Sequence, residues 1–520
     1  MTVAGSDADL AWLAGELSAV RRELLPAGES RALCLALDQG GTSSRAVLLD
    51  ALGREVAAAH VPINTQRPAP DRVEHDAAEL LQSLRVAIRD ACESPLVADR
   101  PIVAAGLATQ RSTVCCWDAT DGTPLSPALS WQDRRHADWL QAQLGKHAAW
   151  VRELTGLPLS PHYGASKLRW CLDELPAVRL ALRDERLRMG PLAGFLLQGL
   201  CEERPALVDP ANASRTLLYD PGVLDWSPLL LDAFGIPQAT LPRCVGTRHD
   251  FGTLRLPSGQ QVPLRACSGD QSAALFAFGP PASDTAYVNA GTGAFVQRVL
   301  RDRTAAAPRG LLQSVVYART DSSDGALHCH EGTINGAYAA LDWLGKRIGI
   351  DVRRCLPSLS GALAETRMPL LFLNGIGGLA APYWRPSFQS EFVALDSASA
   401  GTGDANELQQ VGAVVESIAF LVAVNVEAMQ RTAPLQRLVI TGGLAACDYL
   451  CEVLADATNI SVERPALLEA TARGIAWLAG GESLEWHPVP VERRFSPRPE
   501  SGLRERFQLW RATLERRLGQ

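Results

Sequence analysis

The sequence predicts an α/β protein built from two related domains. Three segments lead to this prediction. Two are hairpins, at 35–50 and 287–296, in which an apolar strand, a turn of small and hydroxyl residues and a second apolar strand follow one another. The third, 438–445, is an apolar strand that runs into Gly442-Gly443. Because glycine lets backbone N–H groups approach phosphate oxygens closely, such turns are typical of sites that hold a phosphorylated ligand.

The first hairpin carries an acidic residue, Asp38, directly before its turn, and Gly41, Thr42 and Ser43 form the turn. The two hydroxyl groups add donors for phosphate oxygens. A carboxylate at Asp38 is placed to hold a Mg²⁺ ion that bridges phosphates, through water, because this ion keeps much of its hydration. The turn is not a lysine-bearing P-loop, since it leads into a strand rather than a helix.

The second hairpin repeats this pattern with Gly291 and Thr292 in its turn. The run from Asp448 to Thr458, after the Gly-Gly pair, reads as a helix, and a base and ribose can lie against such a strand-to-helix junction. Two phosphate hairpins followed by a nucleoside turn are the arrangement of two actin-like ATPase (ribonuclease H-like) domains. In that fold ATP and substrate bind in the cleft between the domains.

From about Ala32 to Arg498, the chain resembles the FGGY carbohydrate kinases, and among them the glycerol kinases most closely. Many short motifs in the same order carry the resemblance, among them Leu37-Asp38-Gln39-Gly40, Val73-Glu74-His75-Asp76, Thr109-Gln110-Arg111, Ser130-Trp131-Gln132, Asn212-Ala213-Ser214-Arg215-Thr216, Gly269-Asp270-Gln271, Ala381-Pro382-Tyr383-Trp384 and Thr441-Gly442-Gly443. The resemblance implies an ATP- and Mg²⁺-dependent phosphotransferase that acts on a hydroxyl group of a small polyol or sugar. Glycerol, giving glycerol 3-phosphate, is the best single expectation.

The resemblance also implies roles for single residues. Asp270 matches the catalytic aspartate, which takes the proton of the acceptor hydroxyl and lies near the metal with Asp38. The matching acceptor-binding residues are Arg111, Trp131, Gln271 and Phe295, and the matching nucleotide-binding residues are Gly41, Thr42, Ser43, Arg45, Gly291, Thr292 and Gly443. A homo-oligomer, either a dimer or a tetramer, is expected as well.

Two positions of the acceptor pocket depart from the glycerol kinase pattern. Ser112 stands where those enzymes have a glutamate, and His162, or Tyr163 if the loop shifts by one, stands where they have a tyrosine. Serine is shorter and neutral, so Arg111 is less compensated and the pocket has more room. A larger polyol, a keto-sugar or a sugar acid is therefore the alternative acceptor.

Three nucleotide-side positions also differ. Tyr338 replaces a glycine near the base, Asp342 a glutamine and Cys447 an asparagine. Tyr338 could stack on the base or narrow its slot.

Composition limits the classes of partner. The chain has 520 residues, a formal net charge of −7 and no long basic cluster, which argues against nucleic acid or an anionic membrane. No stretch reads as long and apolar enough to cross a bilayer, and we expect a cytoplasmic protein. The twelve cysteines lack a CxxC spacing and read as reduced, mostly buried residues.

The predicted domains are an amphipathic helical extension over 1–28, a first domain over 29–279 and a second over 280–520. Gly279-Pro280-Pro281 marks the seam. The extension docks either on the protein's own surface or on a second subunit. The run around 503–518 is expected to be a terminal helix that packs on the body.

Two readings from other classes compete with an active kinase. One is a catalytically weak, ATP-binding regulatory protein, which the changed pocket and the extra helix favour. The other is an actin-like chaperone or filament protein, which would not need Arg111, Trp131 and Phe295 beside Asp270.

Overall fold

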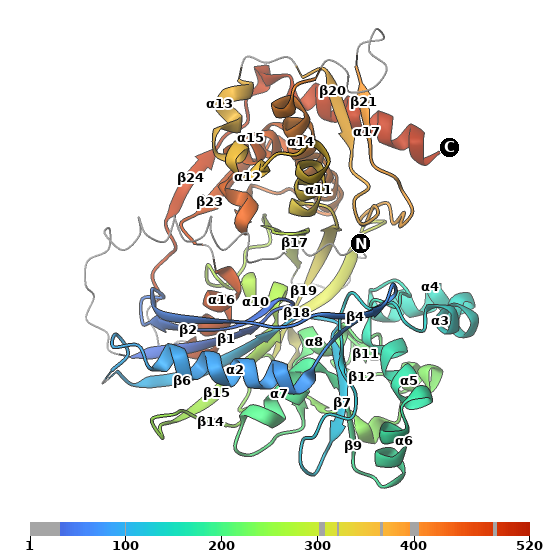
Figure 1. Cartoon of the computed structure of the whole chain (residues 1–520), viewed down its shortest axis with the longest axis vertical. Coiled ribbons are helices and arrows are strands. Elements are labelled where there is room, and N and C mark those ends of the chain that lie inside the picture. Colours follow the sequence, from blue (N-terminus) through green and yellow to red (C-terminus); the bar gives the residue numbers. More distant parts are fainter. Residues whose placement is uncertain are drawn as a thin grey trace.

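Two large sheets, one in each half of the molecule, organise the fold (Figure 1). The structure, a computed structural model, describes residues 32–98, 100–300, 307–319, 322–364, 368–395, 405–467, 469–481 and 486–519. The predicted helical extension over 1–28 lies outside these ranges.

The first sheet has the strand order β14-β15-β6-β1-β2-β3. Its strands are β1 (Leu33–Gln39), β2 (Ser43–Asp50), β3 (Glu55–Pro62), β6 (Ile102–Thr109), β14 (Thr253–Arg255) and β15 (Gln261–Gly269). The hairpin β1–β2 is antiparallel, whereas β6 and β15 add to β1 in parallel. All of β1 is buried, as expected for a strand covered on both faces.

The second sheet, with the order β18-β19-β17-β16-β22-β23-β24, repeats this topology. Its strands are β16 (Thr285–Ala290), β17 (Ala294–Leu300), β18 (Leu312–Arg319), β19 (Ser322–Ile334), β22 (Arg437–Thr441), β23 (Ser461–Pro465) and β24 (Val491–Phe495). An antiparallel hairpin, β16–β17, is again followed by two parallel strands, β22 and β23. The two predicted hairpins and the prediction of two related α/β units are therefore confirmed.

Helices from both halves of the sequence cover the first sheet. α2 (Ala77–Cys92) packs on one face through Leu80, Leu84 and Ala87. The other face is covered by α16 (Ala470–Gly480), whose Ile475 and Ala479 pack against residues of β1 and β6. Figure 1 shows α16, in red, among the blue and green elements of the first half.

The hairpin β18–β19 also crosses between the halves. Its residues Leu312, Val315 and Ala318 lie in the same core as Tyr219 and Trp226 of the first half. The boundary predicted at Gly279 stays a prediction, and segments from beyond it take part in both cores.

The second sheet is covered by long helices, of which α14 (Glu407–Gln430) is the most apolar. α14 begins with a capping box in which Asn406 and Gln409 exchange hydrogen bonds. An 18-residue window of α14 has a mean hydropathy of 1.8, enough by length and composition for a membrane span. The prediction that no stretch is this apolar is therefore wrong, but 89% of the window is buried inside the protein. Burial in the core accounts for its composition.

The terminal helix α17 (Leu503–Leu518) packs on α14, as predicted. Phe507 and Trp510 contact Phe420, and the indole N–H of Trp510 donates to the carbonyl of Phe372.

The remaining elements surround these sheets. A five-stranded sheet in the first half contains β4 (Gln66–Ala69), β5 (Arg72–His75), β8 (Ala128–Leu129), β7 (Val114–Asp118) and β9 (Leu187–Pro191). Short pairs are β10 (Leu207–Val208) with β13 (Arg243–Cys244), β11 (Tyr219–Asp220) with β12 (Asp225–Trp226), and β20 (Leu370–Leu373) with β21 (Glu391–Ala394). The other α-helices are α3 (Ala137–Leu144), α4 (Ala148–Thr155), α5 (Gly164–Glu174), α6 (Pro176–Arg183), α7 (Leu192–Leu200), α8 (Pro210–Ser214), α9 (Pro228–Phe234), α10 (Asp270–Ala274), α11 (Tyr338–Ile348), α12 (Val352–Cys355), α13 (Leu359–Leu363) and α15 (Asp448–Thr458). The range of α15 confirms the predicted helix.

Candidate functional site

The turn of the first hairpin is a tight backbone loop beside an aromatic residue. The N–H of Gly40 donates to the carbonyl of Ser43 at 2.9 Å. A Cβ built on Gly41 would lie 3.7 Å from the indole nitrogen of Trp131. The turn that we expect to hold phosphate is therefore next to a residue that we expect to contact the acceptor.

Asp38 and Arg45 face each other across this hairpin. They are paired in the strand register, and Arg45 Nη1 lies 3.9 Å from Asp38 Oδ2. The same nitrogen lies 2.6 Å from Glu469 Oε2, at the start of α16. Thus one guanidinium links the predicted metal-side carboxylate, the hairpin and α16.

The second hairpin is braced by the N-terminus of α11. The carbonyl of Thr292 accepts hydrogen bonds from the N–H groups of Ala337 and Ala339, at 3.2 and 3.1 Å. Gly291 accepts one from Tyr338. The side chain of Thr292 is exposed at the tip of the turn.

The Gly-Gly turn packs directly against this hairpin. Gly442 has a φ of +87°, and a Cβ there would lie 2.5 Å from the carbonyl oxygen of Ala290. Only glycine fits such a close approach in this conformation. Gly443 begins the 3₁₀ turn Gly443–Ala446, which leads to α15.

Asp270 is the first residue of α10, directly after β15. Its Oδ1 accepts the N–H of Gln271 at 2.7 Å and lies 3.7 Å from Nε of Arg111. Withdrawal from water raises the pKa of Asp270, and the positive charge of Arg111 opposes this rise. The side chain of Gln271 accepts a hydrogen bond from Asn289 on β16, at 3.2 Å, and so links the two halves beside the predicted base.

Arg111 is held by a buried carboxylate that the sequence did not suggest. Glu331 on β19 is 1% exposed, and its two oxygens accept from Arg111 at 2.9 Å and from Arg215 at 2.6 Å. Gln297 also donates to Glu331, at 2.9 Å. Although burial opposes ionisation, the two guanidinium groups lower the pKa of Glu331 to about 2. The second half of the chain therefore orients Arg111, a residue of the first half that we expect to bind the acceptor.

Two of the other residues that we expect to bind the acceptor, Trp131 and His162, lie side by side. The rings of Trp131 and His162 meet edge to face with centroids 5.8 Å apart. Tyr163 instead is 3% exposed and lies in a hydrophobic core, so the structure places His162, of the two alternatives, beside Trp131. Lack of water around the ring, with the positive charges of Arg134 and Lys167, holds the pKa of His162 well below its usual range. Phe295 is half-buried at the start of β17.

Ser112 adopts a left-handed backbone conformation, with a φ of +65°. It is 4% exposed, and no described residue is within hydrogen-bond distance of its hydroxyl oxygen. A buried hydroxyl without a partner costs free energy unless another group supplies a hydrogen bond.

Two of the residues predicted on the nucleotide side are buried. Tyr338 is 4% exposed in the second core and its hydroxyl accepts from Arg353, so its ring has no open face on which a base could stack. Cys447 is 3% exposed, with its thiol directed to the carbonyl of Leu356. Asp342 pairs with Lys346 at 2.7 Å, one turn further along α11. The side chains of Tyr338 and Cys447 are therefore directed into the second core, and their part in binding a nucleotide stays a prediction.

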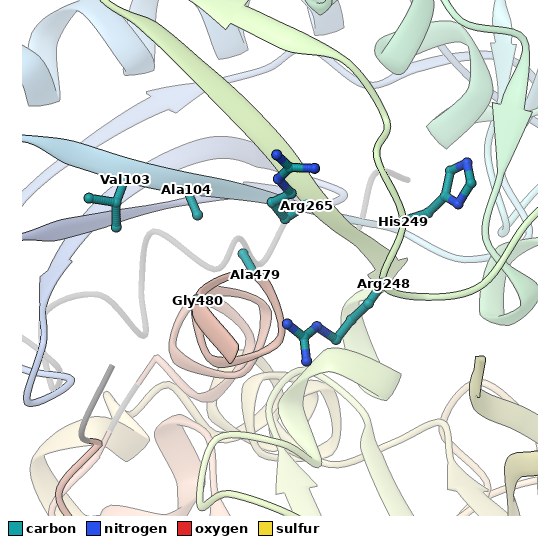
Figure 2. A pocket seen from close by; sticks show the side chains of 7 residues that line it. All are labelled: Val103, Ala104, Arg248, His249, Arg265, Ala479 and Gly480. Carbon is teal, nitrogen blue, oxygen red and sulfur yellow. The ribbon is translucent and has the colours of Figure 1, made fainter. Parts of the chain in front are cut away.

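A separate hollow of about 350 Å³ lies at the C-terminal end of α16 (Figure 2). Val103, Ala104, Arg248, His249, Arg265, Ala479 and Gly480 line it. None of the predicted site residues lies there, and Arg265 pairs with Asp250 at 3.4 Å.

The geometry of Arg45 gives a first testable prediction. Replacing Arg45 with glutamine should raise the KM for ATP by about tenfold or more, because a charge-assisted hydrogen bond to phosphate is lost. The KM for the acceptor should stay unchanged in steady-state assays. Arg54→Gln is the matched control, since Arg54 pairs with Asp50 beyond the far end of the same strand. An unchanged KM for ATP in Arg45→Gln would contradict the assignment.

Comparisons with known proteins agree with this geometry. The N-terminal domain of the FGGY family of carbohydrate kinases matches residues 33–277, and the C-terminal domain of that family matches residues 286–481. The chain is 32% identical over 501 residues to a glycerol kinase of Geobacter sp. (strain M21), covering 93% of this chain and 98% of that protein. It is 34% identical over 496 residues to a glycerol kinase of Thermus brockianus, with coverage of 93% and 98%.

Solved structures share the fold at lower identity. Plasmodium falciparum glycerol kinase with ADP has a TM-score of 0.84 at 22% identity, covering 93% of this chain and 98% of that one. A gluconate kinase from Lactobacillus acidophilus has a TM-score of 0.78 at 17% identity, covering 94% and 98%. The predicted two-domain kinase fold and the predicted family are confirmed. The chain belongs to the FGGY family of carbohydrate kinases.

Proposed function

We propose that this protein transfers the γ-phosphoryl group of ATP to a hydroxyl group of a small polyol, with glycerol as the best single candidate. The observation that carries this proposal is the position of Asp270, which stands beside Arg111 and, through Gln271, is linked to the strand that leads into the second hairpin. Glycerol kinases that cover nearly the whole chain support the same acceptor class.

In the proposed reaction, Asp270 accepts the proton of the acceptor hydroxyl while the oxygen of this hydroxyl forms a bond to the γ-phosphorus. The bond from this phosphorus to the bridging oxygen breaks, and ADP leaves. The raised pKa of Asp270 makes it a better base than an exposed carboxylate. Arg111 and Gln271 orient the acceptor, with Trp131 and Phe295 against its carbon side. Gly41, Thr42, Ser43, Arg45, Gly291 and Thr292 hold the phosphates, and Gly443 lies under the adenosine.

The residues present fit Mg²⁺ as the accompanying ion. The described residues contain no group of three or more His, Cys, Asp or Glu side chains that could hold a metal by themselves. Mg²⁺ instead needs only one or two carboxylates when phosphate oxygens and water complete its shell. Asp38, with its side chain 10% exposed beside Arg45, and Asp270 would supply them and the ion would neutralise phosphate charge.

The test is a coupled ADP-release assay with Mg-ATP. It compares glycerol with four- and five-carbon polyols, keto-sugars and sugar acids. ADP release that depends on glycerol and saturates with it supports the proposal. No ADP release with any of these acceptors would contradict the proposal and favour a catalytically weak, ATP-binding regulatory protein.

A larger acceptor is the second candidate, and Ser112 favours it. Restoring the carboxylate in Ser112→Glu should shift the ratio of kcat/KM toward glycerol and against four- and five-carbon acceptors by about tenfold, because the pocket loses room and gains a hydroxyl acceptor. Ser112→Ala is the control, since it adds neither charge nor length at this position. If the ratio stays the same in Ser112→Glu, Ser112 does not determine specificity.

We also place the enzyme in the cytoplasm and propose a homo-oligomer, a dimer or a tetramer. All twelve cysteines lie in the described residues as free thiols, nine of them buried, in keeping with a reducing compartment.

A further inference from the structure

The chain uses lysine at only three of its 50 basic positions. Lys146 and Lys346 are exposed, whereas Lys167 on α5 is 0% exposed. Every other cation is an arginine. Because arginines such as Arg135 are buried as well, burial alone does not account for a lysine at 167, which indicates a place that suits a compact ammonium group rather than a planar guanidinium.

The ammonium group of Lys167 binds three backbone carbonyls. Nζ donates to Ser112 at 3.0 Å, to Ser130 at 2.8 Å and to His162 at 2.7 Å. An ammonium group has three N–H donors, so its hydrogen-bonding capacity is used completely. No described carboxylate lies within ion-pair distance of it, and the nearby Asp133 is bound to Arg135.

The three carbonyls belong to the three segments that form one side of the predicted acceptor pocket. Ser112 follows Arg111, Ser130 precedes Trp131, and His162 contacts Trp131 through its ring. The segments are separated in sequence, and two of them are also joined by the bond from Trp131 N–H to the Thr113 hydroxyl, at 3.1 Å, and by the pairing of Val114 with Leu129.

We propose that Lys167 is a positioning residue that fixes the shape of the acceptor pocket and thereby its choice of acceptor. This inference rests on the proposed function. Lys167 does not touch the acceptor. It sets the spacing between the arginine, the tryptophan and the histidine that do.

Two physical arguments support a role in positioning rather than in stability alone. A buried charge without an ion partner costs several kcal/mol of desolvation, and an apolar side chain of similar size is often as stable or more so. Burial lowers the pKa of Lys167, and the negative charge of Asp133 opposes this fall. A neutral amine, however, would have only two donors for the three carbonyls. The arrangement therefore needs the charged form.

The test compares Lys167→Met and Lys167→Gln with wild type. We expect kcat/KM for the best acceptor to fall by about 10²-fold, as for reacting groups displaced by an ångström, and the KM for ATP to stay within about twofold. The ratio of kcat/KM between glycerol and a four-carbon polyol should flatten toward unity, less so in Lys167→Gln, which keeps two donors.

Arg298→Met is the matched control, because it removes another buried cation from the protein. Arg298 is 3% exposed and also binds backbone carbonyls, those of Ser283, Met429 and Ala433, at 2.8, 2.9 and 2.6 Å. It should lower Tm without changing the acceptor ratio.

Three results would overturn the inference. If both Lys167 variants keep the wild-type acceptor KM and ratio, the inference is wrong while the proposed function stands. The same holds if the KM values for ATP and acceptor rise equally, as in a generally loosened fold. If wild type releases no ADP with any acceptor, the proposed function itself fails, and this inference fails with it.

Discussion

Asp270→Asn should lower kcat by about 10²–10⁴-fold, because the amide cannot take the proton of the acceptor hydroxyl. The change is nearly isosteric and removes one negative charge close to Arg111. ATP binding should remain, since the hairpins and the Gly-Gly turn are untouched. Coupled ADP release measures kcat, and equilibrium titration with a fluorescent ATP analogue measures nucleotide binding.

Asp456→Asn is the matched control for this substitution. Asp456 is a buried aspartate of α15 that pairs with Arg498 at 2.9 Å, and it has no contact with the site residues. It should lose stability but keep kcat. An Asp270→Asn enzyme that retains most of its activity would show that another group takes the proton.

Glu331→Gln should cost about 3–5 kcal/mol of unfolding free energy, because it removes the carboxylate that neutralises the buried Arg215 and the nearer of the two carboxylates beside the buried Arg111. Arg111 and Arg215 would then lie in the core of the interface between the halves. Urea unfolding at neutral pH measures the loss. A change below about 1 kcal/mol would mean that water or movement compensates the arginines.

Because Glu331 is ionised in the folded protein, we expect the free energy of unfolding to depend on pH. The pKa of Glu331 falls from an ordinary value of 4.5 to about 2 on folding. A depressed carboxylate pKa means that the folded state releases this proton more readily, so the stabilisation is complete above about pH 4.5 and is lost as the pH falls toward 2. Wild type and Glu331→Gln should therefore converge in stability over this range, in urea titrations at a series of acidic pH values.

Local patterns in the sequence were enough to predict the hairpins. The turns at 40–42 and 291–293 are bounded by apolar strands that pair within a few residues, so the contacts that define them are local. Asp270 was identifiable because it directly follows an apolar strand in a motif of the family. The helix α15 and the terminal helix α17 followed from equally local patterns.

Contacts between distant segments could not be read from the sequence in the same way. Glu331 lies 220 residues from Arg111, and nothing local in the run His328-Cys329-His330-Glu331 indicates where its strand is inserted. The resemblance to the family gave the position of Tyr338 along the chain. It did not show that the ring of Tyr338 points into the core. The rarity of lysine in the sequence is a usable signal for Lys167.

The placement of α16 has a consequence for synthesis of the chain. The first sheet is complete once Gly269 has been made, but the helix that covers one of its faces begins at Ala470, about 200 residues later. At ribosomal rates of about 5–20 residues per second, this face stays without α16 for roughly 10–40 s. During that time Cys34, Ala36 and Ala104, which α16 later buries, are open to chaperones or to other nascent chains. The order in which the chain is made therefore exposes apolar surface that the finished protein hides.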